Sequence, residues 1–186
     1  MTRSILLSTA AVLLFGAVAC GDDPFRINWE GNPVEATLFS LDRDELNRPS
    51  GFNMLERRTV IIESAAAEGR WDFLLDREEG NLLLVPAAAM GVDSRAGIVA
   101  VPGAAWDDVT EAPADSLVYI TEEPVQAELG TIYIIRTHMQ FDLFGRQCRF
   151  YGKVEPVELD GEAGILRFLH DTNPSCNDRR LVPRGS

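Results

Sequence analysis

His170 and Asp171 are neighbours near the carboxyl end of the chain, and Ser175 follows shortly after them. A hydroxyl, an imidazole and a carboxylate are the three groups of a hydrolytic triad, in which the imidazole accepts the proton of the hydroxyl. A triad is defined by its geometry in the folded protein, and adjacency in sequence does not supply that geometry. We therefore assign no catalytic residue, and keep a secreted hydrolase that uses acidic residues or the His170–Asp171 region as an alternative.

The segment 171–178 is rich in side-chain oxygens. They occur at alternate positions, on Asp171, Asn173, Ser175 and Asn177. Oxygen ligands spaced in this way could converge on a hard cation such as Ca²⁺. The segment departs from an EF-hand loop, because Cys176 stands where a glycine is needed and the bidentate glutamate is missing. Since Asn and Asp beside a proline also form turns, we expect a structural turn, with calcium as the alternative and no other cofactor.

Trp106 is the best candidate for an exposed contact residue. It follows a Gly-Ala-Ala stretch and precedes Asp107 and Asp108, as in a long loop. Trp71 instead alternates with other apolar residues and is expected in the core. We predict that Trp106, Asp107 and Asp108 contact a ligand or a partner.

Motifs of the common enzyme classes are missing. The chain has no G-x-S-x-G, no H-E-x-x-H, no P-loop and no G-x-G-x-x-G. A pair of carboxylates facing a cleft would suit a glycosidase, but with 29 acidic residues almost any pair could be chosen. The interpretation that the protein is not an enzyme rests on these missing motifs.

The chain is strongly acidic, with a formal net charge of −12 at pH 7. Such a polyanion repels phosphate backbones, so nucleic acid is not expected as a partner. Hydrophobic residues make up 46% of the chain, which suffices for a packed core.

The first nineteen residues have the composition of a secretory signal. Arg3 precedes an uncharged run over 5–19, which as a helix would be about 22 Å long, too short for a bilayer core of about 30 Å. Small residues at 17–19 come directly before Cys20. This arrangement resembles the lipobox of bacterial lipoproteins, although Ala17 stands where leucine is usual. An ordinary cleaved signal beside a chance cysteine is the alternative.

The resemblance to bacterial lipoproteins implies that Cys20 is lipidated and becomes the mature N-terminus. Anchoring by several acyl chains would be effectively permanent, since one chain alone binds only reversibly. Gly21 follows the cysteine, where an aspartate favours retention in the inner membrane of that family, so the outer membrane is favoured if the cell has one. We expect a protein held in the cell envelope through its lipid anchor.

The remaining cysteines, Cys148 and Cys176, are expected to form a disulfide. Exported proteins meet an oxidising compartment, where thiols pair. Closing a loop of about 29 residues would stabilise the fold by roughly 3–4 kcal/mol. A catalytic thiol is the alternative, but neither cysteine lies near a histidine in sequence.

Short runs with strand periodicity, separated by turn residues, fill the rest of the chain. We predict strands over 34–41, 58–63, 70–76, 82–85, 98–101, 117–121, 131–137, 147–160 and 165–170, with a β-bulge at Pro156. Residues 131–137 are apolar on both faces, as in a central strand. This pattern predicts an all-β fold, an antiparallel sandwich or small barrel with long loops.

The predicted organisation is a signal peptide over 1–19, a lipid-anchored tether over 20–30 and a single β domain over 31–180. Residues 181–186 read LVPRGS, which resembles a thrombin cleavage site, and we interpret them as a cloning scar. We expect a non-catalytic binding or accessory module that engages a protein or small ligand through loops. A structural subunit of an envelope complex is a further alternative.

Overall fold

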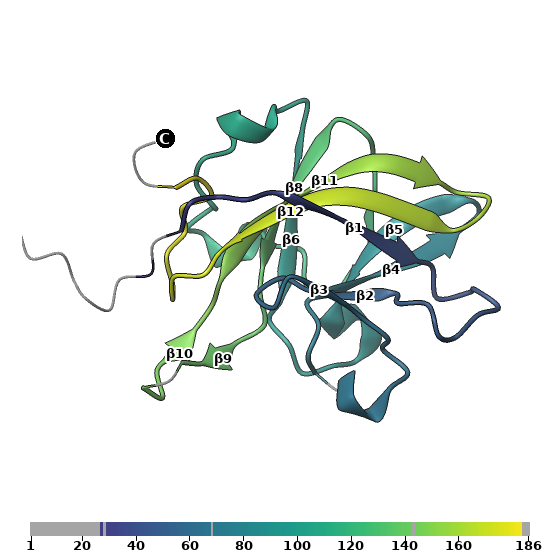
Figure 1. Ribbon diagram of the computed structural model, residues 1–186, viewed down its shortest axis with the longest axis horizontal. Coiled ribbons are helices and arrows are strands. Elements are labelled where there is room, and N and C mark those ends of the chain that lie inside the picture. The colour runs from purple at the N-terminus through teal and green to yellow at the C-terminus, as the bar shows by residue number, and fades with distance from the viewer. Residues whose placement is uncertain (1–26, 28, 68, 143, 184–186) are drawn as a thin grey trace, which may run out of the picture.

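The computed structural model describes residues 27, 29–67, 69–142 and 144–183. The signal, Cys20 and most of the predicted tether lie outside these residues. The described chain forms two five-stranded antiparallel sheets and a small two-stranded one, so the predicted all-β sandwich is confirmed (Figure 1). No described helix has the length and hydropathy that a membrane crossing requires.

The first sheet, sheet A, has five strands in the spatial order β1 (Val34–Phe39), β12 (Ile165–Asn173), β11 (Tyr151–Asp160), β8 (Thr131–Arg136) and β6 (Gly97–Pro102). Sheet B has the order β3 (Arg58–Val60), β2 (Gly51–Asn53), β4 (Phe73–Glu78), β5 (Asn81–Pro86) and β7 (Val125–Gln126). A separate hairpin joins β9 (Gln140–Phe141) to β10 (Gln147–Cys148). Four short 3₁₀ turns lie between strands: η1 (Ala65–Ala67), η2 (Ala87–Met90), η3 (Trp106–Asp108) and η4 (Ser116–Val118).

The core lies between the inner faces of the two sheets. Phe52 and Phe73 of sheet B meet Phe168 of sheet A, with ring centroids 5.1 and 6.1 Å apart. Two further apolar clusters cover the outer faces, one under Trp71 on sheet B and one under Tyr119 on sheet A. These outer clusters explain why β8 is buried along its whole length and reads as apolar on both faces.

Three strand predictions need correction. Residues 117–121 form part of η4 and a single bridge between Ile120 and Ile98, not a strand. The run 147–160 is two strands, because the chain leaves the β9–β10 hairpin before β11 begins at Tyr151. The strand expected from residue 70 starts at Phe73. The predicted bulge is confirmed, since the register of β11 against β12 shifts between Pro156 and Glu158.

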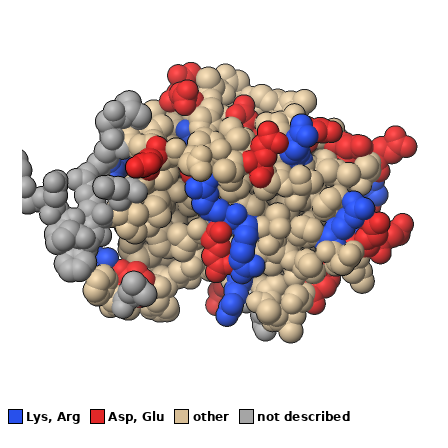
Figure 2. Space-filling view, in the orientation of Figure 1, with Lys and Arg blue, Asp and Glu red and all other residues tan. Residues whose placement is uncertain are grey.

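The two ends of the sandwich differ. One end, called here the hairpin end, holds the 40–48 loop and the turns at 79–80 and 161–164, and acidic side chains gather there on the right of Figure 2. The opposite end, called the loop end, holds the segments 92–95 and 137–149 and the loop 175–178, on the left and lower side of Figure 1. Gly69 lies beside the first two of these segments.

Candidate functional site

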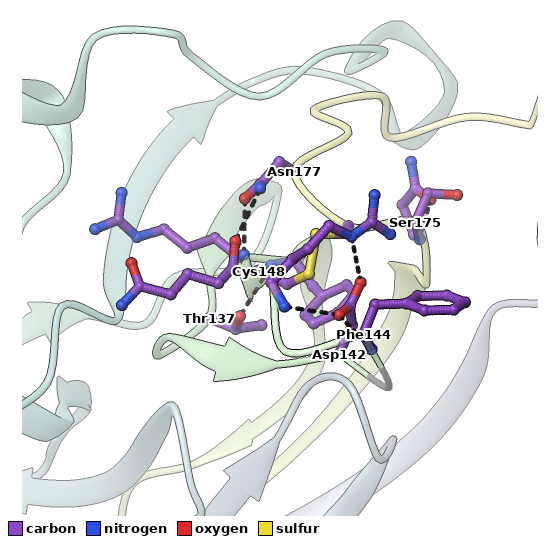
Figure 3. The surroundings of a disulfide bond; sticks show 12 residues. Thr137, Asp142, Phe144, Cys148, Ser175 and Asn177 are labelled. Atoms are coloured by element: carbon purple, nitrogen blue, oxygen red, sulfur yellow. Dashed lines mark hydrogen bonds and ion pairs between the residues drawn. A yellow bond between two sulfur atoms is a disulfide. The ribbon is translucent and has the colours of Figure 1, made fainter.

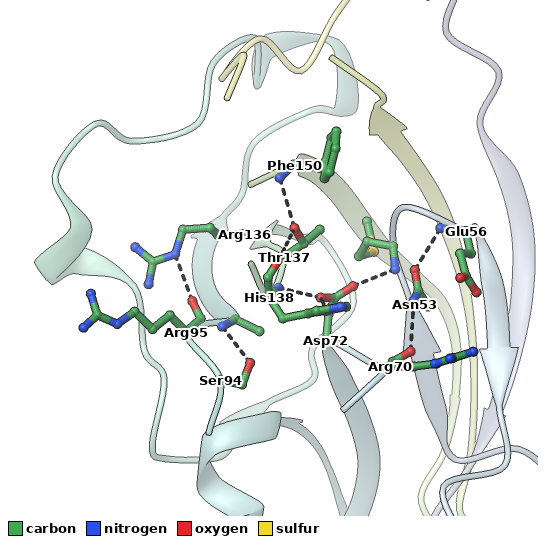
Figure 4. A network of polar contacts seen from close by, with 12 residues as sticks. Asn53, Glu56, Arg70, Asp72, Ser94, Arg95, Arg136, Thr137, His138 and Phe150 are labelled. Atoms are coloured by element: carbon green, nitrogen blue, oxygen red, sulfur yellow. Dashed lines mark hydrogen bonds and ion pairs between the residues drawn. The ribbon is translucent and has the colours of Figure 1, made fainter. Parts of the chain in front are cut away.

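A buried Asp72 hydrogen-bonds to His138 at the loop end (Figure 4). Asp72 directly precedes β4, and its carboxylate accepts hydrogen bonds from the backbone amides of Met54 and His138, both at 2.8 Å. The same carboxylate lies 2.7 Å from Nδ1 of His138. One aspartate therefore ties the loop after β2 to the segment after β8.

The charge of Asp72 also sets the proton affinity of His138. Burial lowers the pKa of His138, but the hydrogen bond and the negative charge of Asp72 outweigh it, so the pKa lies above its usual value. Because Nδ1 is held by the carboxylate, Nε2 is the ring atom left for a ligand. A histidine oriented in this way can donate a hydrogen bond or exchange a proton.

His138 lines a pocket of about 290 Å³. The pocket is made of loop residues only: Gly69, Val92, Asp93, Ser94, Arg95, His138 and Met139. Its volume suits a small polar molecule, and its wall offers a hydroxyl, a guanidinium, a carboxylate and an imidazole. The Ser94 hydroxyl already accepts a hydrogen bond from the amide of Ala96 at 3.1 Å.

The predicted disulfide between Cys148 and Cys176 is present (Figure 3). It joins β10 to the 175–178 loop across 28 positions of sequence. Asp142 lies close to both sulfurs, but each sulfur is bonded to the other, and the Asp142 carboxylate binds the Arg146 side chain and backbone amides of the hairpin. Because both sulfurs belong to the disulfide, this group offers no thiolate ligand to a metal. Asp142 instead stabilises the hairpin through its contacts with Arg146.

The oxygens proposed for calcium point to separate partners. Asp171 accepts a hydrogen bond from the amide of Asn32 and lies 3.5 Å from Arg57. The Asn173 oxygen accepts from the amide of Ser175, and the Asn177 oxygen accepts from the amide of Arg149. The contacts are those of a turn braced by side chains, and they leave these oxygens engaged with the protein itself.

His170 lies in the core, with 1% of its surface exposed. Its ring packs against Phe52 and Phe168, with centroids 4.6 and 5.8 Å away, and its Nδ1 has no hydrogen-bond partner among the described residues. Burial lowers its pKa to about 4, and the charge of Arg57 adds to the effect. This position suits packing, since a substrate would not reach the ring.

Trp106 is half-buried on the outer face of sheet A, while Asp107 and Asp108 are exposed. Lys153, which is buried, lies 4.5 Å from the centroid of the Trp106 ring. Its ammonium also donates to the carbonyls of Trp106 and Val109. Much of the indole is thus used to hold the 106–109 turn on the sheet.

Apolar side chains are exposed on the hairpin beside the disulfide. Phe141 is 70% exposed and Phe144 is 69% exposed, and Met139 lies at the start of the same segment. The Arg146 guanidinium lies 5.7 Å from the centroid of the Phe144 ring. An exposed aromatic pair of this kind is typical of a contact surface.

Sequence reasoning missed His138 and Asp72. His138 stands alone in the sequence, and its partner precedes it by 66 positions. One feature could have identified Asp72: it is an acidic residue inside the apolar run WDFLL, where a buried carboxylate must find hydrogen-bond donors.

Comparison with known protein families, with curated proteins and with solved structures finds no match for this chain.

Proposed function

We propose that the protein is a lipid-anchored binding or accessory module of the cell envelope, which engages a small ligand or a protein through its loop end without catalysis. The observation that carries the binding role is the His138 pocket, because every residue that lines it belongs to a loop. A rigid sandwich that presents loops at one end is a common way to position a binding site.

The anchor is proposed from the lipobox-type sequence that ends at Cys20, and Gly21 favours the outer membrane of a diderm cell. Ile27, where the described chain starts, is seven positions after Cys20 in sequence. An extended tether of that length reaches at most about 25 Å, so the domain would stay close to the bilayer. The exposed Phe141 and Phe144, together with Trp106, Asp107 and Asp108, are candidates for contact with an envelope protein.

Membrane fractionation tests the anchor. In cells of the source type, the wild-type protein is expected in the membrane fraction and Cys20→Ser in the soluble fraction of the envelope. A Cys20→Ser protein that stays with the membrane would contradict anchoring through this residue.

Chemical-shift mapping tests the pocket. We would titrate ¹⁵N-labelled mature protein, in neutral detergent, with acetate, N-acetylglucosamine and triglycine. At least one probe is expected to shift the amides of Gly69 and residues 92–95. Met139→Trp should block this response, whereas Met90→Trp, at an exposed position on η2 that does not line the pocket, should leave it intact. No response to any probe would contradict a binding pocket.

A hydrolase is the second candidate, now centred on His138. Its support is that a buried carboxylate orients the imidazole in a pocket that also contains Ser94. Turnover of p-nitrophenyl acetate that Ser94→Ala and His138→Gln both abolish would favour the hydrolase over the binding module.

A further inference from the structure

Three arginines at the loop end have no acidic partner. Most arginines of the described chain pair with a carboxylate, for example Arg77 with Asp42 and Arg179 with Glu111. Among the residues that the structure describes, Arg95, Arg136 and Arg149 form no ion pair; Arg70 forms none either, but it lies on the other side of His138 (Figure 4). In a chain of net charge −12, unpaired arginines that lie together need an explanation.

The sheet register brings these three side chains to one place. Arg136 ends β8 and is paired with Gly97 of β6 on one side and with Tyr151 of β11 on the other. Arg95 precedes Gly97 by two positions and Arg149 precedes Tyr151 by two positions, so parity directs all three arginines to the outer face of sheet A. Figure 4 shows the side chains of Arg95 and Arg136 extending side by side, away from His138.

Aromatic rings and a glycine complete the site. The Arg136 guanidinium lies 4.3 Å from the centroid of the Tyr119 ring, whose centroid is 6.5 Å from that of Tyr151. A Cβ atom at Gly97 would come within 2.9 Å of the Tyr119 Cβ, so the glycine gives Tyr119 its place on the sheet. These rings flank the guanidinium without neutralising its charge.

The cluster carries unused hydrogen-bond donors. Arg136 is only 5% exposed, and the one hydrogen bond of its side chain within the described chain runs from Nε to the carbonyl of Arg95, at 3.1 Å. The Nε of Arg149 is buried and has no partner among the described residues. Burial lowers the pKa of Arg136, and the positive charges of Arg149 and Arg95 lower it further. An anion would supply the acceptors and the counter-charge that the protein itself does not provide.

We propose that Arg95, Arg136 and Arg149 form a binding site for a phosphate group, carried either by a soluble ligand or by a lipid headgroup. Arginine matches oxyanions through paired N–H donors, and a phosphate offers more acceptor oxygens and more charge to three guanidinium groups than a single carboxylate does. The site extends the proposed binding function to a region that shares only Arg95 with the His138 pocket.

The acidity of the rest of the protein does not exclude this ligand. The acids of the hairpin end lie about 30 Å away, the length of the nine-residue β12, whereas the Debye length at physiological salt is about 8 Å. Asp93 is the acidic residue closest in sequence to the cluster, and it forms no ion pair with these arginines in the described chain. A local group of three arginines therefore attracts a small anion, while the whole protein still repels a polymeric one.

The test follows the arginine side-chain Nε–Hε resonances of the mature protein in neutral detergent, at constant ionic strength. Inorganic phosphate and short-chain phosphatidic acid are the two probes, and acetate is the reference anion. Saturable shifts at Arg95, Arg136 and Arg149 are expected with at least one probe. Saturation by phosphate identifies a soluble ligand as the source, and saturation by phosphatidic acid alone identifies a headgroup. Non-saturating shifts equal to those with acetate would overturn the proposal.

Variants separate this site from the pocket. Arg149→Gln should weaken binding of the probe about tenfold or more, because it removes charge-assisted hydrogen bonds, while the matched Arg70→Gln should leave it unchanged. Met139→Trp, which fills the pocket, should also leave it unchanged. If Met139→Trp abolished the response and Arg149→Gln did not, the phosphate would lie in the His138 pocket, and the arginine site would be refuted while the proposed binding function remained.

Discussion

The hairpin end and the loop end of this sandwich use the same residue types in opposite ways. At the hairpin end, arginines meet carboxylates: Arg77 pairs with Asp42, and Arg48 with Glu45. At the loop end, Arg146 pairs with Asp142, but Arg95, Arg136 and Arg149 form no ion pair among the described residues, a histidine lines a pocket, and aromatic rings are exposed. Arginines at the first end are neutralised by carboxylates of the protein, whereas three arginines at the second have no such counter-charge among the described residues and lie beside exposed apolar surface.

The difference follows from how the chain turns at each end. Hairpin turns at 79–80 and 161–164 connect strands that are already paired, so little chain is left over. At the loop end, the segment 91–96 connects strands of different sheets and the segment 137–150 leaves sheet A, and the Cys148–Cys176 disulfide joins the second segment to the 175–178 loop. The proposed binding surface therefore lies where the regular hydrogen bonding of the sheets stops.

The largest expected loss of stability comes from removing the disulfide of the loop end. Replacing Cys148 and Cys176 by serine should lower the free energy of unfolding by about 3–4 kcal/mol, because the unfolded chain is no longer constrained by a loop of about 29 residues. Urea unfolding of the purified protein measures this. A loss below about 1 kcal/mol would mean that the loop end is held by other contacts.

Acid should weaken the fold through His170. Its folded-state pKa of about 4 lies below its usual value of 6.5, so the unfolded state binds the proton first as the pH falls. The free energy of unfolding should therefore drop between about pH 6.5 and pH 4, by an amount on the order of 3 kcal/mol. His138 contributes with the opposite sign, because its pKa is raised.

His170→Phe isolates this effect, since the phenyl ring can take the imidazole's place against Phe52 and Phe168. Its unfolding free energy should fall less between pH 7 and pH 4 than that of the wild type. Parallel pH profiles would show that His170 is not held neutral in the fold.

Removing the carboxylate of Asp72, which precedes β4, should destabilise the fold more than removing that of Asp76, which lies within β4. Asp72→Ala leaves the buried amide of Met54 without an acceptor and is expected to cost about 2–3 kcal/mol. The pKa of His138 should also fall in this variant, as NMR titration of the ring would report. Asp76→Ala is the matched control, because among the described residues that carboxylate accepts only from the adjacent Arg77 amide. Equal losses in the two variants would remove the distinction between the ends.

The smallest change in stability is expected from breaking exposed ion pairs toward the hairpin end. Arg167 of β12 pairs with Glu35 and Glu158, and all three side chains are about half exposed. Arg167→Gln should change stability by less than about 1 kcal/mol, since solvent screens such pairs. Thermal unfolding at low and high salt would reveal a larger contribution if one existed.

Much of the fold could be predicted from local patterns, because strands buried on both faces leave a continuous apolar run. Residues 131–137 form such a run, and β8 occupies them up to Arg136. The β-bulge was predicted from a different local signal, the proline at position 156. The prediction over 117–121 was wrong because Tyr119 and its neighbours pack over sheet A without joining its ladder. Trp71 is buried as predicted, but on the outer face of sheet B, because the strand begins only at Phe73.

Local sequence patterns could not predict the candidate site. Asp72 and His138 meet only because β4 begins and β8 ends on the same side of the sandwich, although the two strands belong to different sheets. The three arginines likewise lie at the ends of β6, β8 and β11, which are neighbours in sheet A although strands of the other sheets separate them in the chain. Spacing along a sequence does not reveal groups that register and topology assemble.

The most direct test of the difference between the two ends is one titration that observes all arginines together. With inorganic phosphate or phosphatidic acid, we expect saturable shifts of the Nε–Hε resonances of Arg95, Arg136 and Arg149, and little change at Arg48, Arg77 and Arg167. Uniform shifts at both ends, or saturation at the hairpin end, would contradict the claim that binding capacity is concentrated at the loop end.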